Sequence, residues 1–337
     1  MINFSFRRYL WIGSILLFFL SQCSKEPSKP VDPVTKDVTC IISDKSKLEQ
    51  VSIFPADNPL NLDISSAPVD TRSVAIIKLI GTPGLHPDFG SGLYNGAPMG
   101  IPFILVCKDQ TKESILFRGN SYDANYSSES DPGPYPIPLS APIEGNGSGD
   151  SHVIAVDVDN LKLYELYNAS VGTKGWEASG GVIWDLKSNA QRPAGWTSAD
   201  ASGMSILPLL VRYEEVLKGK IDHAIRFTLS KPKTMVAYTA PASHWSSGDN
   251  TDANAPTPYG MRLRLKADFD ISSYSQTNQV ILTAFKKYGL IFADIGSDFF
   301  ITGAPDDRWN NDDLSQLKKI TAVNFEVVQM GTITKRN

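Results

Sequence analysis

The amino-acid sequence predicts a mainly β fold, a β-sandwich or jelly-roll with a few short helices, and leaves an α+β fold as the alternative. The chain of 337 residues contains 25 glycines and 22 prolines, which interrupt it at short intervals. Short apolar runs of strand length lie between these interruptions. No regular alternation of strands and helices appears, so a parallel sheet with crossover helices is not expected.

The clearest strand pair is a β-hairpin formed by residues 153–157 and 161–167, which flank the turn residues 158–160. In residues 261–265 apolar side chains alternate with Arg262 and Arg264, so the pattern predicts that both arginines face solvent. Further strands are expected over 101–106, 182–186, 224–229, 235–238 and 290–294.

Three short helices are expected over residues 71–80, 280–288 and 312–319. The first two end at Gly81 and Gly289, and glycine is the usual residue after the last helical turn. The third begins with acidic and ends with basic side chains, as the helix dipole favours.

The N-terminus carries Arg7 and Arg8 before an apolar run over residues 9–20, which is typical of a secretory signal peptide. The run is too short to span a bilayer. It ends in Leu20-Ser21-Gln22-Cys23, which resembles the lipobox of bacterial lipoproteins, although Gln22 stands where a small residue is usual. This resemblance implies cleavage before Cys23, lipidation of that cysteine, and a membrane partner held through the lipid.

The resemblance divides the chain into a signal peptide at residues 1–22, a lipidated cysteine with a flexible tether at 23–40, and a single β-rich globular domain at 41–337. The tether is expected because residues 24–33 are polar and rich in proline. The expected location is the cell envelope, at the outer membrane because no aspartate follows Cys23. With Cys23 lipidated, Cys40 and Cys107 are predicted to form a disulfide, with two buried free thiols as the alternative.

The globular part resembles a group of secreted bacterial proteins without an assigned role. This resemblance extends over most of the chain after residue 55, and it implies an exported domain but no chemistry. It is carried by residues 130–138, 195–200, 222–228 and 287–294.

The composition, 42% hydrophobic and 20% charged, is that of an ordinary globular protein. The net charge of −4 gives no indication of nucleic-acid binding. The common catalytic and cofactor-binding motifs are missing from the sequence, so no cofactor is predicted. Residues 306–313 carry enough oxygen ligands for calcium but lack the EF-hand spacing, and helix capping explains them equally well.

The candidate catalytic residues are two histidines, each next to a carboxylate at a strand end and suited to act as a base, and two residues that could act as the acid. They are His152, His223, Asp200 and Glu165. We expect His152, the loop of residues 196–200 and His223 to line one shared pocket. A zinc site would need His86, His152 and either His223 or His244 to converge.

Candidate ligand-binding residues are large aromatic side chains near acidic loops, since such rings stack on sugars. They are Trp196, Tyr135, Trp176 and Trp245. These patterns favour a lipoprotein facing the periplasm or the cell surface that binds a glycan or a protein partner. A carbohydrate-active hydrolase or lyase using His, Asp and Glu side chains is the alternative.

Overall fold

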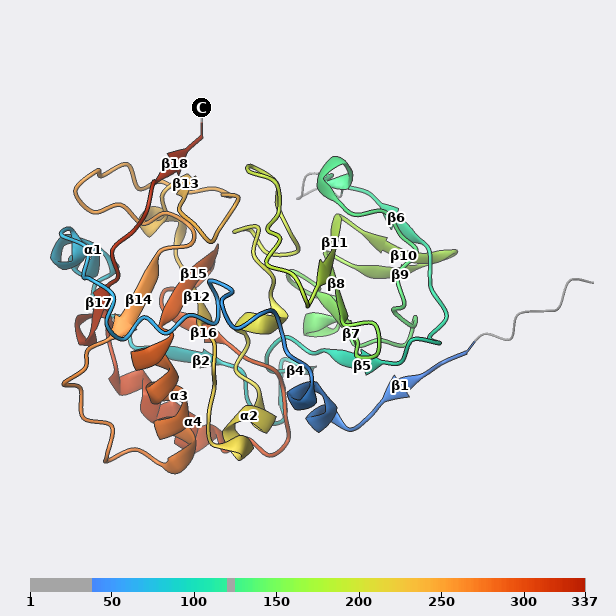
Figure 1. Cartoon of the computed structure of the whole chain (residues 1–337), viewed down its shortest axis with the longest axis horizontal. Helices are drawn as coiled ribbons and strands as arrows, with labels where there is room; N and C mark the ends of the chain where they lie inside the picture. The colour runs from blue at the N-terminus through green and yellow to red at the C-terminus, as the bar shows by residue number, and fades with distance from the viewer. Residues whose placement is uncertain (1–37, 120–124, 337) are drawn as a thin grey trace, which may run out of the picture. The chain divides into compact units, whose positions relative to one another are not determined.

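The largest sheet has six strands and carries most of the α-helices beside it. The structure, a computed structural model, describes residues 38–119 and 125–336. In this sheet parallel and antiparallel pairs alternate irregularly, and α3 packs against β14 (Figure 1). Its strand order is β17 (Phe325–Val327), β14 (Arg262–Leu265), β15 (Leu290–Ile295), β12 (Ile225–Leu229), β16 (Phe300–Thr302) and β2 (His86–Asp88).

A second sheet has five strands, of which β7 and β8 form the hairpin that the sequence predicts. β5 pairs with β7 in parallel, and the other neighbours in this sheet are antiparallel. Its order is β1 (Ile41–Ile42), β5 (Ile104–Val106), β7 (Val153–Asp157), β8 (Lys162–Tyr167) and β11 (Gly180–Asp185).

Three small sheets complete the strand content. The first is β6 (Ile115–Phe117), β10 (Gly175–Ala178) and β9 (Ser170–Gly172). The others are the pair β13 (Ala237–Tyr238) with β18 (Thr334–Lys335) and the pair β3 (Leu93–Tyr94) with β4 (Ala97–Pro98). The described residues therefore form a β-rich α+β fold, and the predicted fold class is confirmed.

The five-stranded sheet is buried on both faces, because successive side chains of β7 enter different apolar clusters. Ile154 and Val156 join the main core, which also contains residues of the six-stranded sheet. Val153 and Ala155 join a smaller cluster with Trp176 of β10. The three-stranded sheet thus packs on one face of the five-stranded sheet, as in a small sandwich.

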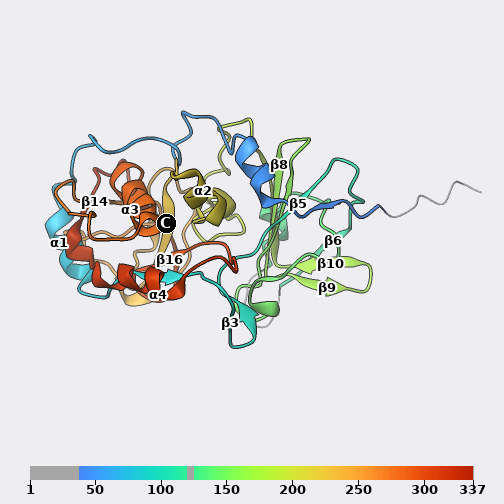
Figure 2. The same ribbon diagram turned by 90° about the horizontal axis from the view of Figure 1, so that it is seen from below.

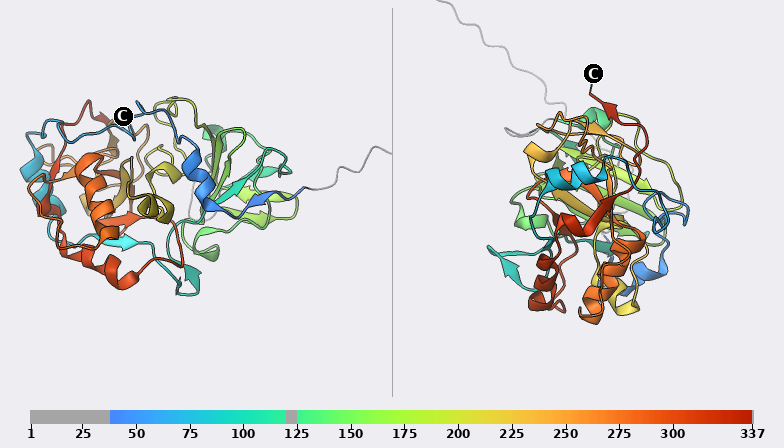
Figure 3. Two further views of the ribbon diagram at one scale, coloured as in Figure 1. Left: turned by 60° about the horizontal axis from the view of Figure 1, so that its bottom comes forward. Right: turned by 90° about the vertical axis from the view of Figure 1, so that its left-hand side faces the viewer.

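The helices are short and lie mostly beside the six-stranded sheet. Figures 2 and 3 show α1, α3 and α4 grouped around β14 and β16, away from the green strands of the five-stranded sheet. They are α1 (Ser73–Ile80), α2 (Tyr213–Lys218), α3 (Gln276–Lys287) and α4 (Asn311–Leu314). Seven 3₁₀ helices are also described: η1 (Lys45–Gln50), η2 (Ser127–Glu129), η3 (Glu144–Asn146), η4 (Leu207–Leu209), η5 (Lys231–Lys233), η6 (Ser315–Lys319) and η7 (Ala322–Asn324).

Helix α3 begins four residues earlier than the sequence predicts and ends as expected. The Ser275 side chain accepts a hydrogen bond from the Asn278 N–H at 3.2 Å and caps the helix. Gly289 follows with φ of +75°, and a Cβ there would lie 2.2 Å from the Leu263 carbonyl oxygen. Glycine at this position therefore lets the chain turn from α3 directly into β15, beside β14.

The prediction that Arg262 and Arg264 face solvent is wrong. Arg264 is buried, and it pairs with Glu326 and donates to the Ala67 carbonyl at 2.9 Å. Arg262 is half-buried and donates to the Pro59 carbonyl at 2.9 Å. Both arginines do lie on the same face of β14, as the alternation predicts. The segment before α1 covers that face, and its carbonyl groups accept hydrogen bonds from both guanidinium groups.

Cys40 and Cys107, for which the sequence predicts a bridge, are joined by a disulfide with Cα atoms 5.7 Å apart. The Cys40 N–H donates to Gln110 Oε1 at 2.8 Å, and the Val38 N–H donates to Thr111 Oγ1 at 2.7 Å. Residues 38–40, which the sequence assigns to the tether, are therefore already fastened to the globular unit.

The predicted signal peptide, Cys23 and residues 24–37 of the tether lie outside the described residues. Within residues 38–119 and 125–336, no helix has both the length and the apolar character needed to cross a bilayer.

Candidate functional site

A cavity of about 300 Å³ lies where the loop after β11 meets the end of β15, and we call it the carboxylate cavity. Its volume is at the lower limit for small-molecule sites. Most of its lining side chains are polar. They are Tyr126, Asp150, Tyr167, Thr197, Ser198, Ala199, Asp200, Ala201, His244, Ser246, Ser247, Asp294 and Ile295.

Asp200 lies at the wall of this cavity and is held by a buried arginine. Arg226 of β12 donates from Nε to Asp200 Oδ2 at 2.9 Å, and its Nη2 lies 2.9 Å from the same oxygen. Arg226 Nη1 donates to Thr302 Oγ1 at 2.9 Å. Burial raises the pKa of Asp200, while the charges of Arg226 and His152 act in the opposite direction. The two guanidinium contacts favour an ionised Asp200.

Asp294 is the second carboxyl group near the same guanidinium, with Oδ2 4.0 Å from Arg226 Nη2. Its side chain is 17% exposed, whereas the Asp200 side chain is fully buried. Burial and the nearby charge of Asp200 raise the pKa of Asp294 well above its ordinary value. Two carboxyl groups with different surroundings thus share one cavity, and Asp294 is the one that holds a proton more readily.

A β-bulge positions Asp294. Phe227 of β12 pairs with Phe292, but Thr228 pairs with Asp294, so Ala293 is an extra residue in β15. In a regular strand Asp294 would point to the same face as the buried Phe292. The bulge re-aims the side chains that follow it, as bulges beside functional sites commonly do.

His244 contributes a neutral imidazole to the cavity lining. Its Nδ1 lies 2.7 Å from the Ala201 carbonyl oxygen, so Nδ1 carries the proton and Nε2 keeps its lone pair. Burial lowers the pKa of His244, which favours this neutral form. The cavity therefore contains one group suited to donate a proton, Asp294, and one suited to accept it.

Two of the four predicted ligand-binding aromatic residues are chain neighbours of lining residues, although neither lines the cavity itself. Trp196 precedes Thr197, is 36% exposed, and has the Arg192 guanidinium 5.3 Å from its ring centroid. Trp245 stands between His244 and Ser246 and stacks on Tyr238.

The other two, Tyr135 and Trp176, are buried in the small apolar cluster, and this burial corrects their prediction as ligand contacts. The Trp176 indole donates to the Ile137 carbonyl at 2.9 Å. The Tyr135 hydroxyl donates to the Asp131 carbonyl at 2.7 Å. Their polar atoms are already bonded within the protein, so both residues belong to the core.

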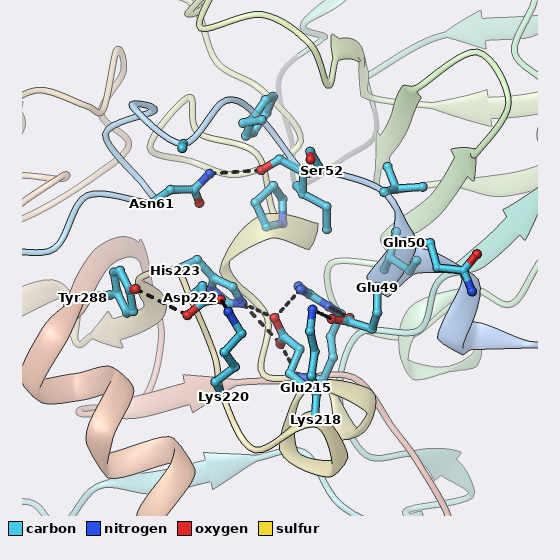
Figure 4. Close-up of a pocket in the computed structure, with 17 residues that line it drawn as sticks. Glu49, Gln50, Ser52, Asn61, Glu215, Lys218, Lys220, Asp222, His223 and Tyr288 are labelled. Atoms are coloured by element: carbon cyan, nitrogen blue, oxygen red, sulfur yellow. Dashed lines mark hydrogen bonds and ion pairs between the residues drawn. The ribbon is translucent and has the colours of Figure 1, made fainter.

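A larger cavity of about 430 Å³ contains His223 and is lined mainly by η1, the loop after it and α2 (Figure 4). His223 Nδ1 faces the Ala224 carbonyl at 2.7 Å, and its Nε2 faces Glu215 Oε1 at 3.0 Å. Both ring nitrogens therefore lie within hydrogen-bond distance of an acceptor inside the protein.

The charges around this His223 cavity compensate one another, as the dashed lines in Figure 4 illustrate. Glu215 pairs with Arg212 as well as with His223, and Glu49 lies 3.5 Å from Lys218. Lys220 pairs with Asp222. The network fastens η1 to α2, and it explains His223 as a structural residue.

The prediction of one pocket shared by His152, Asp200 and His223 is wrong. Asp200 lines the carboxylate cavity, His223 lines the other cavity, and His152 lines neither. His152 lies behind the wall of the carboxylate cavity, with Nε2 2.9 Å from the Ala199 carbonyl and Nδ1 2.6 Å from Glu144 Oε2. Its burial and its two acceptors make His152 a support for the loop that carries Asp200.

Glu165, predicted as a catalytic acid, is fully buried in the main core. Its Oε1 accepts from the Ile206 and Leu207 N–H groups, each at 2.9 Å, and its Oε2 accepts from the Trp184 indole at 2.9 Å. Burial raises the pKa of Glu165 to about 7, and these hydrogen bonds oppose the shift. Glu165 thus anchors the segment before η4, and a substrate could not reach it.

The structure does not support the zinc alternative, because the described residues contain no group of three or more His, Cys, Asp or Glu side chains that could hold a metal ion. His86 instead stacks on Phe300, with ring centroids 4.0 Å apart. The acids considered for calcium also have other partners. Asp306 pairs with Arg308, and Asp313 accepts hydrogen bonds from Ser275 and Asn278.

Sequence reasoning missed Asp150 and Asp294 as cavity residues, and it missed Arg226 as the counter-charge of Asp200. The run that ends at Asp294 did predict a strand with a carboxylate at its end. The alternation from His223 to Arg226 also places their side chains on opposite faces, which agrees with their separate surroundings. The bulge and the long-range pairing with Asp200 have no local sequence signal.

No protein-family model, curated protein or solved structure matches this chain.

Proposed function

We propose that the chain is a lipoprotein of the bacterial envelope, anchored by lipid on Cys23 at the outer membrane, and that its globular unit binds a glycan in the carboxylate cavity. The anchor rests on Arg7 and Arg8, the apolar run after them and Leu20-Ser21-Gln22-Cys23. Two or more acyl chains on one cysteine would give stable membrane attachment.

The observation that carries the glycan proposal is the lining of the cavity. Carboxyl groups, hydroxyl groups and one imidazole line the same small space, with Tyr126 and Tyr167 as aromatic walls. Sugars present hydroxyl groups to such polar atoms and C–H faces to such rings. Trp196 does not line the cavity, but it is exposed and directly precedes Thr197, so we include its ring in the proposed binding surface.

A panel of neutral and charged oligosaccharides, titrated against the exported protein by calorimetry and by tryptophan emission, tests the glycan proposal. Trp196→Ala should weaken binding by about tenfold, since ring stacking contributes up to about 1.5 kcal/mol. Tyr94→Ala is the matched control, because Tyr94 is an exposed aromatic residue on the β3–β4 hairpin. If no oligosaccharide binds, or if both variants bind like the wild type, the proposal fails.

Metabolic labelling with a clickable fatty acid tests the anchor separately. The wild type should be labelled and should fractionate with membranes, and Cys23→Ala should lose both properties. Equal labelling of the variant and the wild type would contradict lipidation at Cys23.

The second candidate function is hydrolysis of a glycosidic bond, and the presence of Asp294 and His244 in one cavity favours it. In this step the bond between the anomeric carbon and the leaving oxygen breaks, and Asp294 gives its proton to that oxygen. A water oxygen bonds to the anomeric carbon, and the water proton passes to His244 Nε2. Release of reducing ends that Asp294→Asn and His244→Gln both abolish would support hydrolysis. Release that survives both changes would exclude these roles.

A further inference from the structure

The acidic and basic side chains that line the carboxylate cavity are three aspartates and one histidine. Asp150, Asp200 and Asp294 line it, and neither lysine nor arginine occurs among its lining residues. The Arg226 guanidinium lies behind the wall and is engaged by Asp200. His244 has a lowered pKa and adds no compensating charge at neutral pH. With Asp200 already engaged by Arg226, Asp150 and Asp294 are the carboxyl groups that a ligand can meet, and no fixed cation lines the cavity beside them. A positively charged ligand would favour the ionised form of Asp294, so the cavity favours such a ligand over an anionic one.

An unsatisfied acceptor in the wall also points to a ligand that donates hydrogen bonds. Asp200 Oδ1 is buried and has no hydrogen-bond partner among the described residues, although Oδ2 of the same carboxylate binds Arg226. A buried carboxylate oxygen without a donor is costly, so its presence beside a cavity needs an explanation. Asp200 lines the cavity, so a hydrogen-bond donor on a ligand is one partner that would satisfy this oxygen.

The aromatic walls of the cavity suit the same kind of ligand. The ring centroids of Tyr126 and Tyr167 lie 6.5 Å apart and tilted, and both residues line the cavity together with Asp150. Tyrosine rings attract cations through their electron-rich faces, and a nearby carboxylate strengthens that attraction.

We propose that the ligand of the carboxylate cavity carries a protonated amine, and that it is an amino sugar. The amine lies among Asp150, Asp294 and the two tyrosine rings, and the sugar hydroxyl groups bond to Ser246 and Ser247. This inference rests on the proposed glycan binding and specifies the class of glycan. It does not depend on whether the bound sugar is cleaved.

Two oligosaccharides of the same length and linkage test the inference, the β-1,4-linked tetramer of glucosamine and the tetramer of N-acetylglucosamine. They differ in the charged amine, so calorimetry near neutral pH measures its contribution. We expect the glucosamine tetramer to bind at least fivefold more tightly. This advantage should shrink as ionic strength rises, since salt screens partly exposed charges.

Asp294→Asn and Asp150→Asn should each weaken the glucosamine tetramer by about fivefold and leave the acetylated tetramer nearly unchanged. Asp249→Asn is the matched control, because Asp249 is an exposed aspartate that pairs with Lys231 outside the cavity. Thermal unfolding of each variant reports whether it is folded. Asp294→Asn keeps an oxygen for the Ile295 N–H, which Asp294 Oδ1 accepts at 2.7 Å.

Proton release gives a second measurement that does not depend on affinity. An ammonium group beside Asp294 should lower the raised pKa of this carboxyl group, so binding should release a proton at any pH where the free protein holds one on Asp294. Calorimetry in two buffers of different ionisation enthalpy detects this proton, and Asp294→Asn should abolish it.

The outcomes separate this inference from the proposed function. Equal or tighter binding of the acetylated tetramer would overturn the amine inference and leave glycan binding intact. Equally tight binding of a lysine amide that carries no sugar would also overturn it, because the site would then recognise an amine alone. If neither tetramer binds and no other oligosaccharide does, both the inference and the proposed function are wrong.

Discussion

Arg226 Nε donates to Asp200 Oδ2 at 2.9 Å, and the pair joins β12 to the loop after β11 at a point where both side chains are buried. Replacing Arg226 by methionine leaves the Asp200 carboxylate buried without its counter-charge. We expect Arg226→Met to lower the free energy of unfolding by about 3–5 kcal/mol. Chemical denaturation followed by circular dichroism measures this loss.

An exposed pair provides the matched control for this prediction. Arg118 and Glu177 lie 2.6 Å apart with side chains 38% and 30% exposed, so Arg118→Met should cost about 1 kcal/mol or less. The double variant Arg226→Met with Asp200→Leu should be less destabilised than Arg226→Met alone, because it removes the unpaired charge. Equal costs for Arg226→Met and Arg118→Met would contradict the buried-pair argument.

Local patterns in the sequence predict the hairpin of β7 and β8, the end of α3 at Gly289 and the strand β15. Each depends on residues close together in the chain, so periodicity and turn chemistry suffice. The site depends on contacts between distant segments, as in the pairing of Asp200 with Arg226 across 26 residues. Such contacts leave no signal in a single sequence.

The errors at Arg264 and Glu165 have related causes. Alternation separates the two faces of a strand, but it does not say which face solvent reaches. A segment far away in the sequence covers Arg264, and the start of η4 brings the Ile206 and Leu207 N–H groups to Glu165. Polar residues that a sequence would place at the surface or in a site are here buried and hydrogen-bonded.

The ion pair of His152 with Glu144 should make stability depend on pH. Burial alone would lower the pKa of His152, but the charge and hydrogen bond of Glu144 raise it to about 9, compared with 6.5 in an unfolded chain. The native state therefore binds this proton more tightly, and the stabilisation is full below about pH 6.5 and is lost as pH rises through about 9. The loss amounts to about 3 kcal/mol, since one pKa unit corresponds to about 1.4 kcal/mol.

His152→Gln should remove this pH dependence, because glutamine does not titrate. The difference in unfolding free energy between the wild type and the variant, measured by denaturation at several pH values, should shrink as pH rises through this window. A difference that stays constant across the window would show that His152 is neutral in the native state.

Glu165 should affect stability, because its carboxylate accepts hydrogen bonds from four donors. Glu165→Gln places an amide N–H₂ where the Trp184 indole needs an acceptor, so we expect the free energy of unfolding to fall by about 1–3 kcal/mol.

Burial raises the pKa of Glu165 to about 7 from 4.5, so the stability of the wild type should fall as pH rises between these values. The stability of Glu165→Gln should change less over the same range. Denaturation across this range measures both effects, and an unchanged midpoint with lost ligand binding would point instead to a role in the site.

The Cys40–Cys107 disulfide closes a loop of 67 residues and fastens β1 to β5. In the chain-entropy view a loop of this length stabilises the native state by up to about 4 kcal/mol.

β1 has only two residues, so without the bridge we expect this end to open locally, at less cost than global unfolding. Changing both cysteines to serine should therefore speed hydrogen exchange at Ile42 by more than any fall in the denaturation midpoint explains. Reduction of the wild type should reproduce this effect. Arg118→Met, which leaves the disulfide intact, serves as the control. If exchange at Ile42 and the midpoint both match the wild type after the bridge is removed, then the Cys40 and Val38 hydrogen bonds alone hold this end of the chain.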